Sequence, residues 1–435
     1  MFLTKKRILI SAAIAALVLT AAALLRPRAA GEDTAGSAAS SPEKTSAPFC
    51  FVVASDLHYL SPSLNDNGTF FQNMMEEADG KTTQYAEEVT EAFVSEVIFL
   101  HPDALVLTGD LTFNGARKSH QDLAKKLQKI RDAGIPVYVI SGNHDLNSTN
   151  AARFSGDGYT LVSGVTPEEF EKIYAPFGFS DALSKDSASS SYAVSPAPGL
   201  RFLLLDVNGV ERACHIPEET LRWIEAQLQD AKAEGDLVLS FSHQNLLQHS
   251  FFTDGYVIDN ADSLLSLYDT YGVPINFTGH LHIQHQQKDS GFLEVATSAL
   301  SVSPEHYAAV TVDDSGLHYQ TNSVDVAAYA AEQGSTDANL LEFADWSKNY
   351  FLRLSKNSAE EQLQDLTDAD QKEEMADYFA QQNYQYFSGA PQKSQKGNAI
   401  LSEWDDTGTF IAKYLDSIAA ARKDQNHFDL SLPQQ

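Results

Sequence analysis

Five short polar segments along the chain each follow an apolar run that is typical of a β-strand. The apolar runs are 51–54, 104–107, 137–140, 237–241 and 273–277. The polar segments, in order, are Asp56-Leu57-His58, Gly109-Asp110, Gly142-Asn143-His144-Asp145, His243, and Gly279-His280-Leu281-His282. In open α/β sheets, ligands bind outside the carboxyl ends of the strands, so segments far apart in sequence can meet there. The pattern therefore predicts an α/β fold with one polar site at the strand ends.

The side chains in these segments are carboxylates, imidazoles and an amide, without a thiolate among them. This set suits manganese, iron or zinc at a hydrolytic centre and disfavours copper(I) or iron–sulfur clusters. Two divalent ions about 3.5–4 Å apart stabilise both the attacking and the leaving oxygen of an in-line displacement. The segments therefore predict a cofactor of two divalent metal ions (Mn, Fe or Zn).

Taken in this order, the segments resemble the signature of the calcineurin-like metallophosphoesterase superfamily: DxH, GD, GNHD or GNHE, a lone His, and GHxH. All five blocks are complete, and the resemblance covers positions 49 to 323. It implies a first metal held by Asp56, His58, Asp110 and His282. It implies that Asp110 bridges to a second metal, whose other ligands are Asn143, His243 and His280.

The resemblance leaves His144 outside both ligand sets and facing the substrate. A hydroxide bridging the two metals is available near neutral pH, because coordination lowers the pKa of bound water. It would attack phosphorus in line, and His144 would protonate the departing alkoxide. Asp145 is expected either to orient His144 or a metal ligand, or to cap the turn after its strand.

Two departures narrow the family. Purple acid phosphatases carry a tyrosine three residues after the GD aspartate, whereas this chain has Phe113, which has no side-chain oxygen for ferric iron. Protein Ser/Thr phosphatases carry Asp-Arg-Gly after the GD block, and residues 111–115 read Leu-Thr-Phe-Asn-Gly instead. Both subclasses are disfavoured.

The layout is most similar to exported or membrane-anchored bacterial members that have a helical carboxy-terminal extension, among which are cyclic-nucleotide phosphodiesterases. The resemblance therefore implies a metal-dependent phosphoric ester hydrolase, a phosphodiesterase acting on small phosphodiesters such as cyclic nucleotides. The alternatives are a phosphomonoesterase or nucleotidase, and a non-catalytic exported binding protein. A 5'-nucleotidase is disfavoured because that group usually adds a large mixed α/β domain.

The charge balance limits the partners. The formal net charge is −29, which argues against binding a nucleic-acid polymer or an anionic membrane surface through a basic patch. A small phosphoester remains compatible, because two metal ions would be the largest local charges in the pocket. Membrane contact is expected only through the amino-terminal segment.

The amino terminus predicts export. Lys5, Lys6 and Arg7 precede an uncharged apolar run over 8–25, which is typical of a signal peptide or a single membrane anchor. The positive flank places the catalytic domain outside the cell membrane, anchored there or secreted after cleavage. Arg26 and Arg28 follow the apolar run and favour a retained anchor.

The expected domains are the signal or anchor (1–28), a flexible linker (29–48), the catalytic domain (49–325) and a helical carboxy-terminal domain or cap (326–435). In the catalytic domain, amphipathic helices are predicted over 83–100, 120–133 and 217–233. The superfamily resemblance implies a four-layer α/β/β/α sandwich. Strands at 292–296, 307–312 and 317–322 are expected to complete its second sheet. In the cap, helical spacing marks 339–354, 359–366, 369–382 and 407–421.

Contacts with substrate are expected from loops 147–159 and 246–256, which follow His144 and His243. Asn114 and His249 are candidate substrate contacts, although an exposed loop histidine needs no function. The aromatic residues of the cap are expected to pack against each other or to stack on a base; they are Tyr378, Phe379, Tyr384, Tyr386 and Phe387. Cys50 and Cys214 form either a disulfide or two separate thiols.

Overall fold

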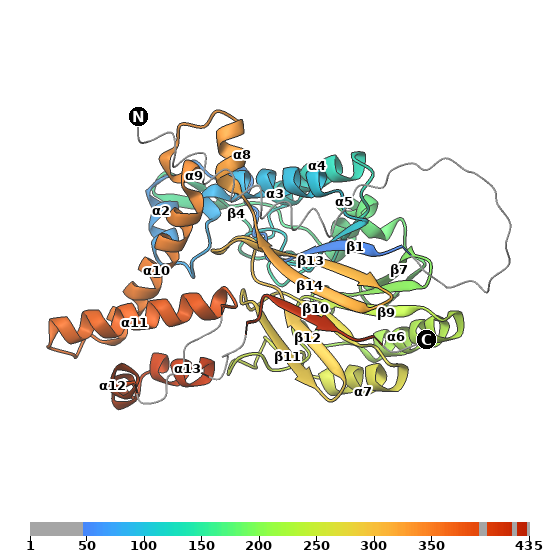
Figure 1. The fold of residues 1–435 in the computed structure, drawn as a ribbon. Helices are drawn as coiled ribbons and strands as arrows, with labels where there is room; N and C mark the ends of the chain where they lie inside the picture. The colour runs from blue at the N-terminus through green and yellow to red at the C-terminus, as the bar shows by residue number, and fades with distance from the viewer. Residues whose placement is uncertain (1–46, 391–397, 420–423, 433–435) are drawn as a thin grey trace, which may run out of the picture.

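The computed structural model describes residues 47–390, 398–419 and 424–432. Two β-sheets lie face to face, with helices on their outer sides (Figure 1). The first sheet has the strand order β15 (His427–Leu430), β14 (Gly316–Ser323), β13 (His306–Asp313), β1 (Phe49–Ala54), β2 (Ala104–Leu107) and β3 (Val137–Val139). The second has the order β11 (His285–Asp289), β12 (Phe292–Ala296), β10 (Ile275–Thr278), β9 (Leu237–Ser242), β8 (Leu200–Leu205), β7 (Tyr192–Ala197) and β6 (Ser184–Lys185). The predicted four-layer fold is confirmed.

The core lies between the sheets and is rich in phenylalanine. Phe51 of β1 packs against Phe202 of β8 and Phe277 of β10, with ring centroids 5.1 and 6.0 Å apart. Strands β1, β2 and β3 are parallel to one another, as are β8, β9, β10 and β12. Because parallel strands end at the same edge of a sheet, the polar segments that follow them are brought together.

Helices α3 (Ala86–Leu100) and α4 (Arg117–Asp132) lie beside the first sheet, and α6 (Glu218–Glu234) and α7 (Ala261–Tyr271) beside the second (Figure 1). The apolar positions Leu123, Leu127 and Ile130 of α4 recur at helical spacing and are fully buried, which explains why this segment is helical. The three amphipathic helices predicted from the sequence are present. Residues 83–85, predicted as the start of α3, form a separate 3₁₀ turn.

The hairpin of β13 and β14 belongs to the first sheet, not the second. β13 pairs antiparallel with β1, with Val52 opposite Ala309. Of the three strands predicted at 292–296, 307–312 and 317–322, only the first, β12, belongs to the second sheet. The prediction that all three strands complete the second sheet is therefore wrong for β13 and β14. Alternating apolar residues predict a strand and its turn, but they do not specify which strand it pairs with.

The carboxy-terminal region is helical as predicted, with one exception. Its helices are α8 (Val326–Glu332), α9 (Ala338–Leu341), α10 (Phe343–Gln362), α11 (Ala369–Phe387), α12 (Ala399–Thr407) and α13 (Phe410–Ile418). Helix α10 runs through the break expected between residues 354 and 359. The chain then returns to the catalytic sheet as β15, which pairs with β14 and was not expected.

Most of the aromatic residues of this region pack against each other. Phe379 and Tyr386 are buried in a cluster with Trp404 and Leu415, so packing, rather than stacking on a base, accounts for these two residues. Cys50 and Cys214 are not joined in a disulfide.

No helix within the described ranges is long and apolar enough to cross a membrane. The signal or anchor predicted at 1–28, and the linker up to residue 46, lie outside the described residues. Export and a cell-membrane location therefore stay predictions.

Candidate metal centre

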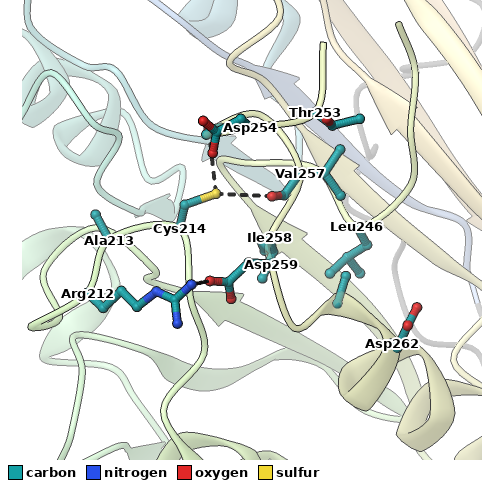
Figure 2. Close-up of a pocket in the computed structure, with 12 residues that line it drawn as sticks. Arg212, Ala213, Cys214, Leu246, Thr253, Asp254, Val257, Ile258, Asp259 and Asp262 are labelled. Carbon is teal, nitrogen blue, oxygen red and sulfur yellow. Dashed lines mark hydrogen bonds and ion pairs between the residues drawn. The ribbon is translucent and has the colours of Figure 1, made fainter. Parts of the chain in front are cut away.

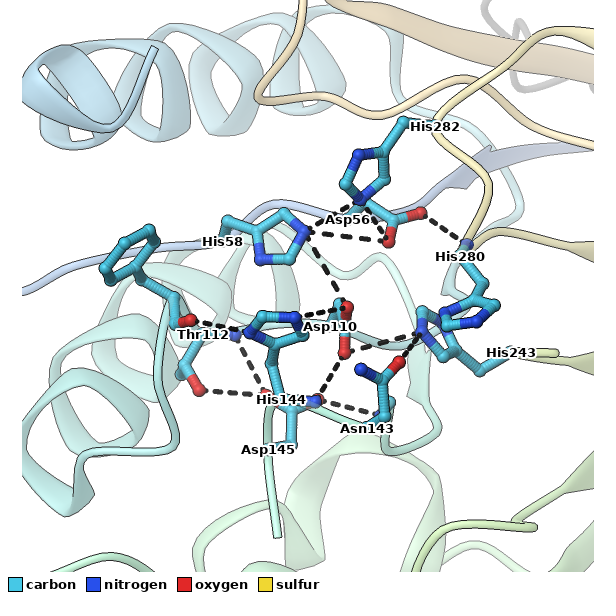
Figure 3. Close-up of polar contacts among 12 residues, drawn as sticks. Asp56, His58, Asp110, Thr112, Asn143, His144, Asp145, His243, His280 and His282 are labelled. Atoms are coloured by element: carbon cyan, nitrogen blue, oxygen red, sulfur yellow. Dashed lines mark hydrogen bonds and ion pairs between the residues drawn. The ribbon is translucent and has the colours of Figure 1, made fainter. Parts of the chain in front are cut away.

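The first predicted ligand set converges at the ends of three strands (Figure 3). Asp56 and His58 follow β1, Asp110 follows β2, and His282 follows β10. One side-chain atom from each of the four lies within 4.8 Å of all the others. His282 Nε2 is 3.1 Å from His58 Nε2 and 3.4 Å from Asp56 Oδ1.

The second set shares Asp110 with the first. Asp110, His243 and His280 form a second group of convergent ligand atoms, and Asn143 Oδ1 lies 3.1 Å from His243 Nε2. Asp110 Oδ2 is 3.7 Å from His58 Nε2, whereas Asp110 Oδ1 is 3.4 Å from His243 Nε2. One carboxylate oxygen thus faces each set, which is the placement that a bridging ligand requires.

Five of the seven predicted ligands have a left-handed backbone. Their φ angles are 53° for Asp56, 42° for His58, 46° for Asp110, 69° for His280 and 58° for His282. Non-glycine residues adopt this region at a cost of about 1–3 kcal/mol each, and such residues cluster at functional sites. The backbone is therefore strained where it must turn consecutive side chains into one site.

The glycine of the GD segment is needed for close approach. A Cβ at Gly109 would lie 2.6 Å from His243 Nδ1, and its φ is 98°. A side chain at this position would displace a predicted ligand.

The side chains fit a divalent cation. Asp56 Oδ1 is buried and has no hydrogen-bond partner among the described residues, and a buried carboxylate oxygen without a partner is costly. The facing Nε2 atoms of His58 and His282 add two further lone-pair donors at 3.1 Å. A cation would satisfy all of these atoms together.

The charges of these side chains also favour a bound cation. Burial disfavours the charged form of Asp110, but the attraction of His243 and a hydrogen bond with it more than compensate, so the pKa of Asp110 is held well below its usual range. The pKa of Asp56 is also lowered: burial acts against this, but the charge of His282 outweighs it. His243 is buried too, yet Asp110 raises the pKa of its imidazole to about 9. Both carboxylates are ionised at neutral pH and can attract cations.

Main-chain carbonyls orient two of the histidines. His243 Nδ1 donates to the Thr108 carbonyl at 2.8 Å, which leaves Nε2 as the ligand atom. His280 Nε2 donates to the Gly255 carbonyl at 3.1 Å, which leaves Nδ1. Fixing the tautomer of a histidine in this way is the usual role of groups behind metal ligands.

His144 lies beside both sets without joining either. Its Nδ1 donates to the Phe113 carbonyl at 2.9 Å, and its Nε2 is 3.9 Å from Asp110 Oδ2. The side chain is 39% exposed, whereas those of His58 and His243 are fully buried. A substrate can therefore reach His144. Its orientation comes from the main chain of Phe113, the residue that replaces the tyrosine of purple acid phosphatases.

Asp145 makes no hydrogen bond with the His144 ring, so the structure does not support the expectation that it orients this histidine. It accepts hydrogen bonds from the backbone N–H groups of Leu111, Thr112 and Gly142 at 2.9–3.0 Å. Burial and the nearby charge of Asp110 raise its pKa to about 6. Asp145 therefore ties the loop after β2 to the loop after β3, which is the turn-capping alternative.

The two candidate substrate contacts, His249 and Asn114, are buried. His249 is 6% exposed; its Nδ1 is 3.0 Å from His285 Nδ1, and its Nε2 is 3.2 Å from Glu294 Oε2. The expectation that His249 is an exposed loop histidine is therefore wrong, and its burial among these partners disfavours the alternative of a contact with phosphate. Asn114 is 7% exposed, and its amide donates to the Ala152 carbonyl at 3.3 Å. Both side chains hold loops in place.

Two residues beside the first set were missed by the sequence analysis. Asp79 Oδ2 is 3.6 Å from His282 Nδ1 and 2.6 Å from Lys81 Nζ. Lys81 is 9% exposed. The Asp79 side chain is 53% exposed. Partial desolvation opposes its charge, but the attraction of Lys81 keeps the pKa of Asp79 well below its usual range. The Asp-Gly-Lys segment matches no motif, so no sequence signal marks it.

A cavity of about 590 Å³ lies beside the loop that follows His243, but none of the predicted metal ligands lines it (Figure 2). Its walls include three acidic residues (Asp254, Asp259 and Asp262) and one basic residue, Arg212, which pairs with Asp259. This excess of negative charge disfavours a phosphate ester. The centre at Asp110 is the better candidate for chemistry.

Sequence comparisons point to the same chemistry. Residues 50–284 match the family model described as calcineurin-like phosphoesterase, and residues 325–426 match the model described as the C-terminal domain of cyclic nucleotide phosphodiesterase. The chain is 28% identical to sphingomyelin phosphodiesterase 2 of Caenorhabditis elegans over 166 residues, 32% of this chain and 25% of that protein. It therefore spans about a quarter of the length of that relative.

A bacterial protein is also similar. The chain is 24% identical to a probable cyclic nucleotide phosphodiesterase of Vesicomyosocius okutanii over 190 residues, 43% of this chain and 66% of that one. Among solved structures, a dimetal phosphatase from Danio rerio aligns with 63% of this chain and 96% of its own, at 15% identity and a TM-score of 0.46. Since the calcineurin-like phosphoesterase model matches more than half of the 435 residues, the protein belongs to the calcineurin-like phosphoesterase family.

Proposed function

We propose that the protein is a dinuclear metal-dependent phosphodiesterase that hydrolyses small phosphodiesters such as cyclic nucleotides. One observation carries the proposal. A complete set of seven converging ligand residues is joined, in one chain, to a region at 325–426 that matches the C-terminal domain of cyclic nucleotide phosphodiesterase. The relatives from C. elegans and V. okutanii carry names that refer to phosphodiester substrates, which supports a diester over a monoester.

The ligand residues define where the metals would be held. Asp56, His58 and His282 would hold the first ion, Asn143, His243 and His280 the second, and Asp110 both. When bound, two such ions lower the pKa of water and neutralise the charge that builds up on phosphorus during displacement.

His144 would supply the proton for the leaving oxygen. A carbonyl oxygen can only accept, so Nδ1 of His144 must donate to Phe113, and the proton that its imidazolium can release is on Nε2. Nε2 points toward the ligand cluster and lies 3.9 Å from Asp110 Oδ2. General acid catalysis of this kind contributes about 10²–10⁴ in rate.

A comparison of diesters and monoesters tests the proposal. The purified protein would be loaded with Mn²⁺, its metal content measured, and kcat/KM determined for bis-p-nitrophenyl phosphate, 3',5'-cyclic AMP and p-nitrophenyl phosphate. We expect the two diesters to be preferred. A preference for the monoester would indicate a phosphomonoesterase, and bound metal without hydrolysis of any of the three would indicate a binding protein.

A further inference from the structure

Four aromatic rings form a continuous surface beside the second ligand set. Phe251, Phe252 and Tyr256 come from the loop after His243, and Phe410 begins α13. The rings of Phe251 and Phe252 stack at 4.3 Å, Phe252 lies 5.3 Å from Tyr256, and Phe410 lies 5.4 Å from Phe251 and 5.8 Å from Phe252. Phe410 is 49% exposed and the other three are half-buried. We call these four residues the aromatic ledge.

The ledge begins at a metal ligand. The ring of Tyr256 lies 4.9 Å from the ring of His280. The neighbouring Gly255 carbonyl accepts the hydrogen bond from His280 Nε2. The surface is therefore continuous with the site at which phosphorus would bind, unlike an isolated apolar patch.

Buried polar contacts fix the loop that bears the ledge. Glu294 accepts hydrogen bonds from the backbone N–H groups of Leu246 and Leu247 at 2.9 and 2.6 Å. The hydroxyl of Tyr386, in α11, donates to the His249 carbonyl at 2.8 Å. Aromatic rings held at a fixed position lose little entropy when a ligand stacks on them, so the ledge is preorganised.

The ledge and His144 lie on opposite sides of Asp110. The His144 ring is 4.9 Å from the His58 ring, on the first-metal side, whereas the His280 ring is 5.0 Å from the His243 ring, on the second (Figure 3). Because the leaving oxygen must face His144, the ester group that stays on phosphorus is the one that can extend toward His280 and the ledge.

We propose that the aromatic ledge is a specificity site that binds a planar aromatic group on the retained side of the phosphodiester. This inference rests on the proposed phosphodiesterase function and adds the substrate class. Stacking on aromatic side chains selects flat π-systems such as nucleobases without selecting one base over another. Because Phe410 belongs to the region that matches the cyclic nucleotide phosphodiesterase C-terminal domain, that region would contribute directly to substrate choice.

Three diesters with the same leaving group test the ledge: the phenyl, cyclohexyl and methyl esters of p-nitrophenyl phosphate. The variants are Phe410→Leu and Phe252→Leu, which keep apolar bulk and remove the ring. The matched control is Phe99→Leu, at the end of α3, where the ring is 73% exposed. For both ledge variants we expect KM for the phenyl ester to rise about two- to tenfold, the range that aromatic pairing supports. The change should be confined to the phenyl ester, and the control should match wild type.

Several results would overturn the inference. Equal losses for the phenyl and cyclohexyl esters would make the surface a general apolar contact, and unchanged KM in both variants would show that the substrate does not touch it. Phe410 is at the surface, so its variant is informative even if Phe252→Leu impairs folding. If wild-type protein with bound metal hydrolyses none of the three diesters, the proposed function fails instead, independently of the ledge.

Discussion

The first and second ligand sets, which we call the two halves of the candidate metal centre, differ in the groups that contact their histidines. In the first half, His282 contacts Asp79, which forms an ion pair with Lys81. Behind the second, His243 and His280 donate to the main-chain carbonyls of Thr108 and Gly255. A charged pair can tune the basicity of a ligand, whereas a main-chain carbonyl ties a ligand to the position of its loop.

The two halves also have different neighbours, which suggests different roles in the reaction. The first half lies close to His144, the proposed proton donor. The second half shares its loop with the aromatic ledge and, through Tyr386, with the carboxy-terminal helices. We infer that the first half serves mainly the reaction and the second half links the reaction to substrate choice.

The largest effect is expected from a substitution that removes a ligand of both halves. Asp110→Ala removes the carboxylate that faces both ligand sets, so both metals should be lost, and with them most of the catalysis that two ions supply. Asp56→Ala and His243→Ala should each weaken mainly one site. Metal content by mass spectrometry and hydrolysis of bis-p-nitrophenyl phosphate would be measured for all three. Normal metal content and full activity in Asp110→Ala would refute the bridging role.

The next largest effect is expected from a substitution that impairs proton transfer but leaves metal binding intact. His144→Ala should keep both metals, because its ring lies outside the two ligand groups, yet kcat should fall by about 10²–10⁴. The loss should be greatest for diesters with poor leaving groups, because a good leaving group departs without a proton. The dependence of kcat on the leaving-group pKa would be compared with that of wild type. An unchanged slope would exclude His144 as the acid.

The convergence of the seven candidate ligand residues was predictable from the sequence, because each is a motif residue at a strand end. The groups behind them were not. The partner of His144 is a main-chain carbonyl, at Phe113, which any residue type would supply. His249 was misplaced because its partner Glu294 lies in a distant strand, and no local pattern marks that pairing. The wrong assignment of β13 and β14 to the second sheet has the same cause, because the local alternation of apolar residues does not specify which distant strand each one pairs with.

A smaller effect should be confined to the first half. Asp79→Asn keeps the shape of the side chain but removes the charge that faces His282 and Lys81, and loss of a group behind a metal ligand typically costs about 10–100-fold in metal affinity. Calorimetric titration with Mn²⁺ should show one site weakened and the other unchanged. Asp181→Asn is the matched control, since Asp181 pairs with Arg131 by a similar ion pair. Equal weakening of both sites would contradict the separation of the halves.

The smallest effect concerns the link from the second half to the carboxy-terminal helices. Tyr386→Phe removes the donor to the buried His249 carbonyl and should cost about 1 kcal/mol of stability. Tyr350→Phe is a close control, because the Tyr350 hydroxyl also donates to a main-chain carbonyl, that of Met75. Both variants should lower Tm by similar amounts, but only Tyr386→Phe should raise KM for diesters, because of these two tyrosine hydrogen bonds only that of Tyr386 reaches the loop of the ledge. If the two variants change KM equally, the helices stabilise the fold without setting the position of that loop.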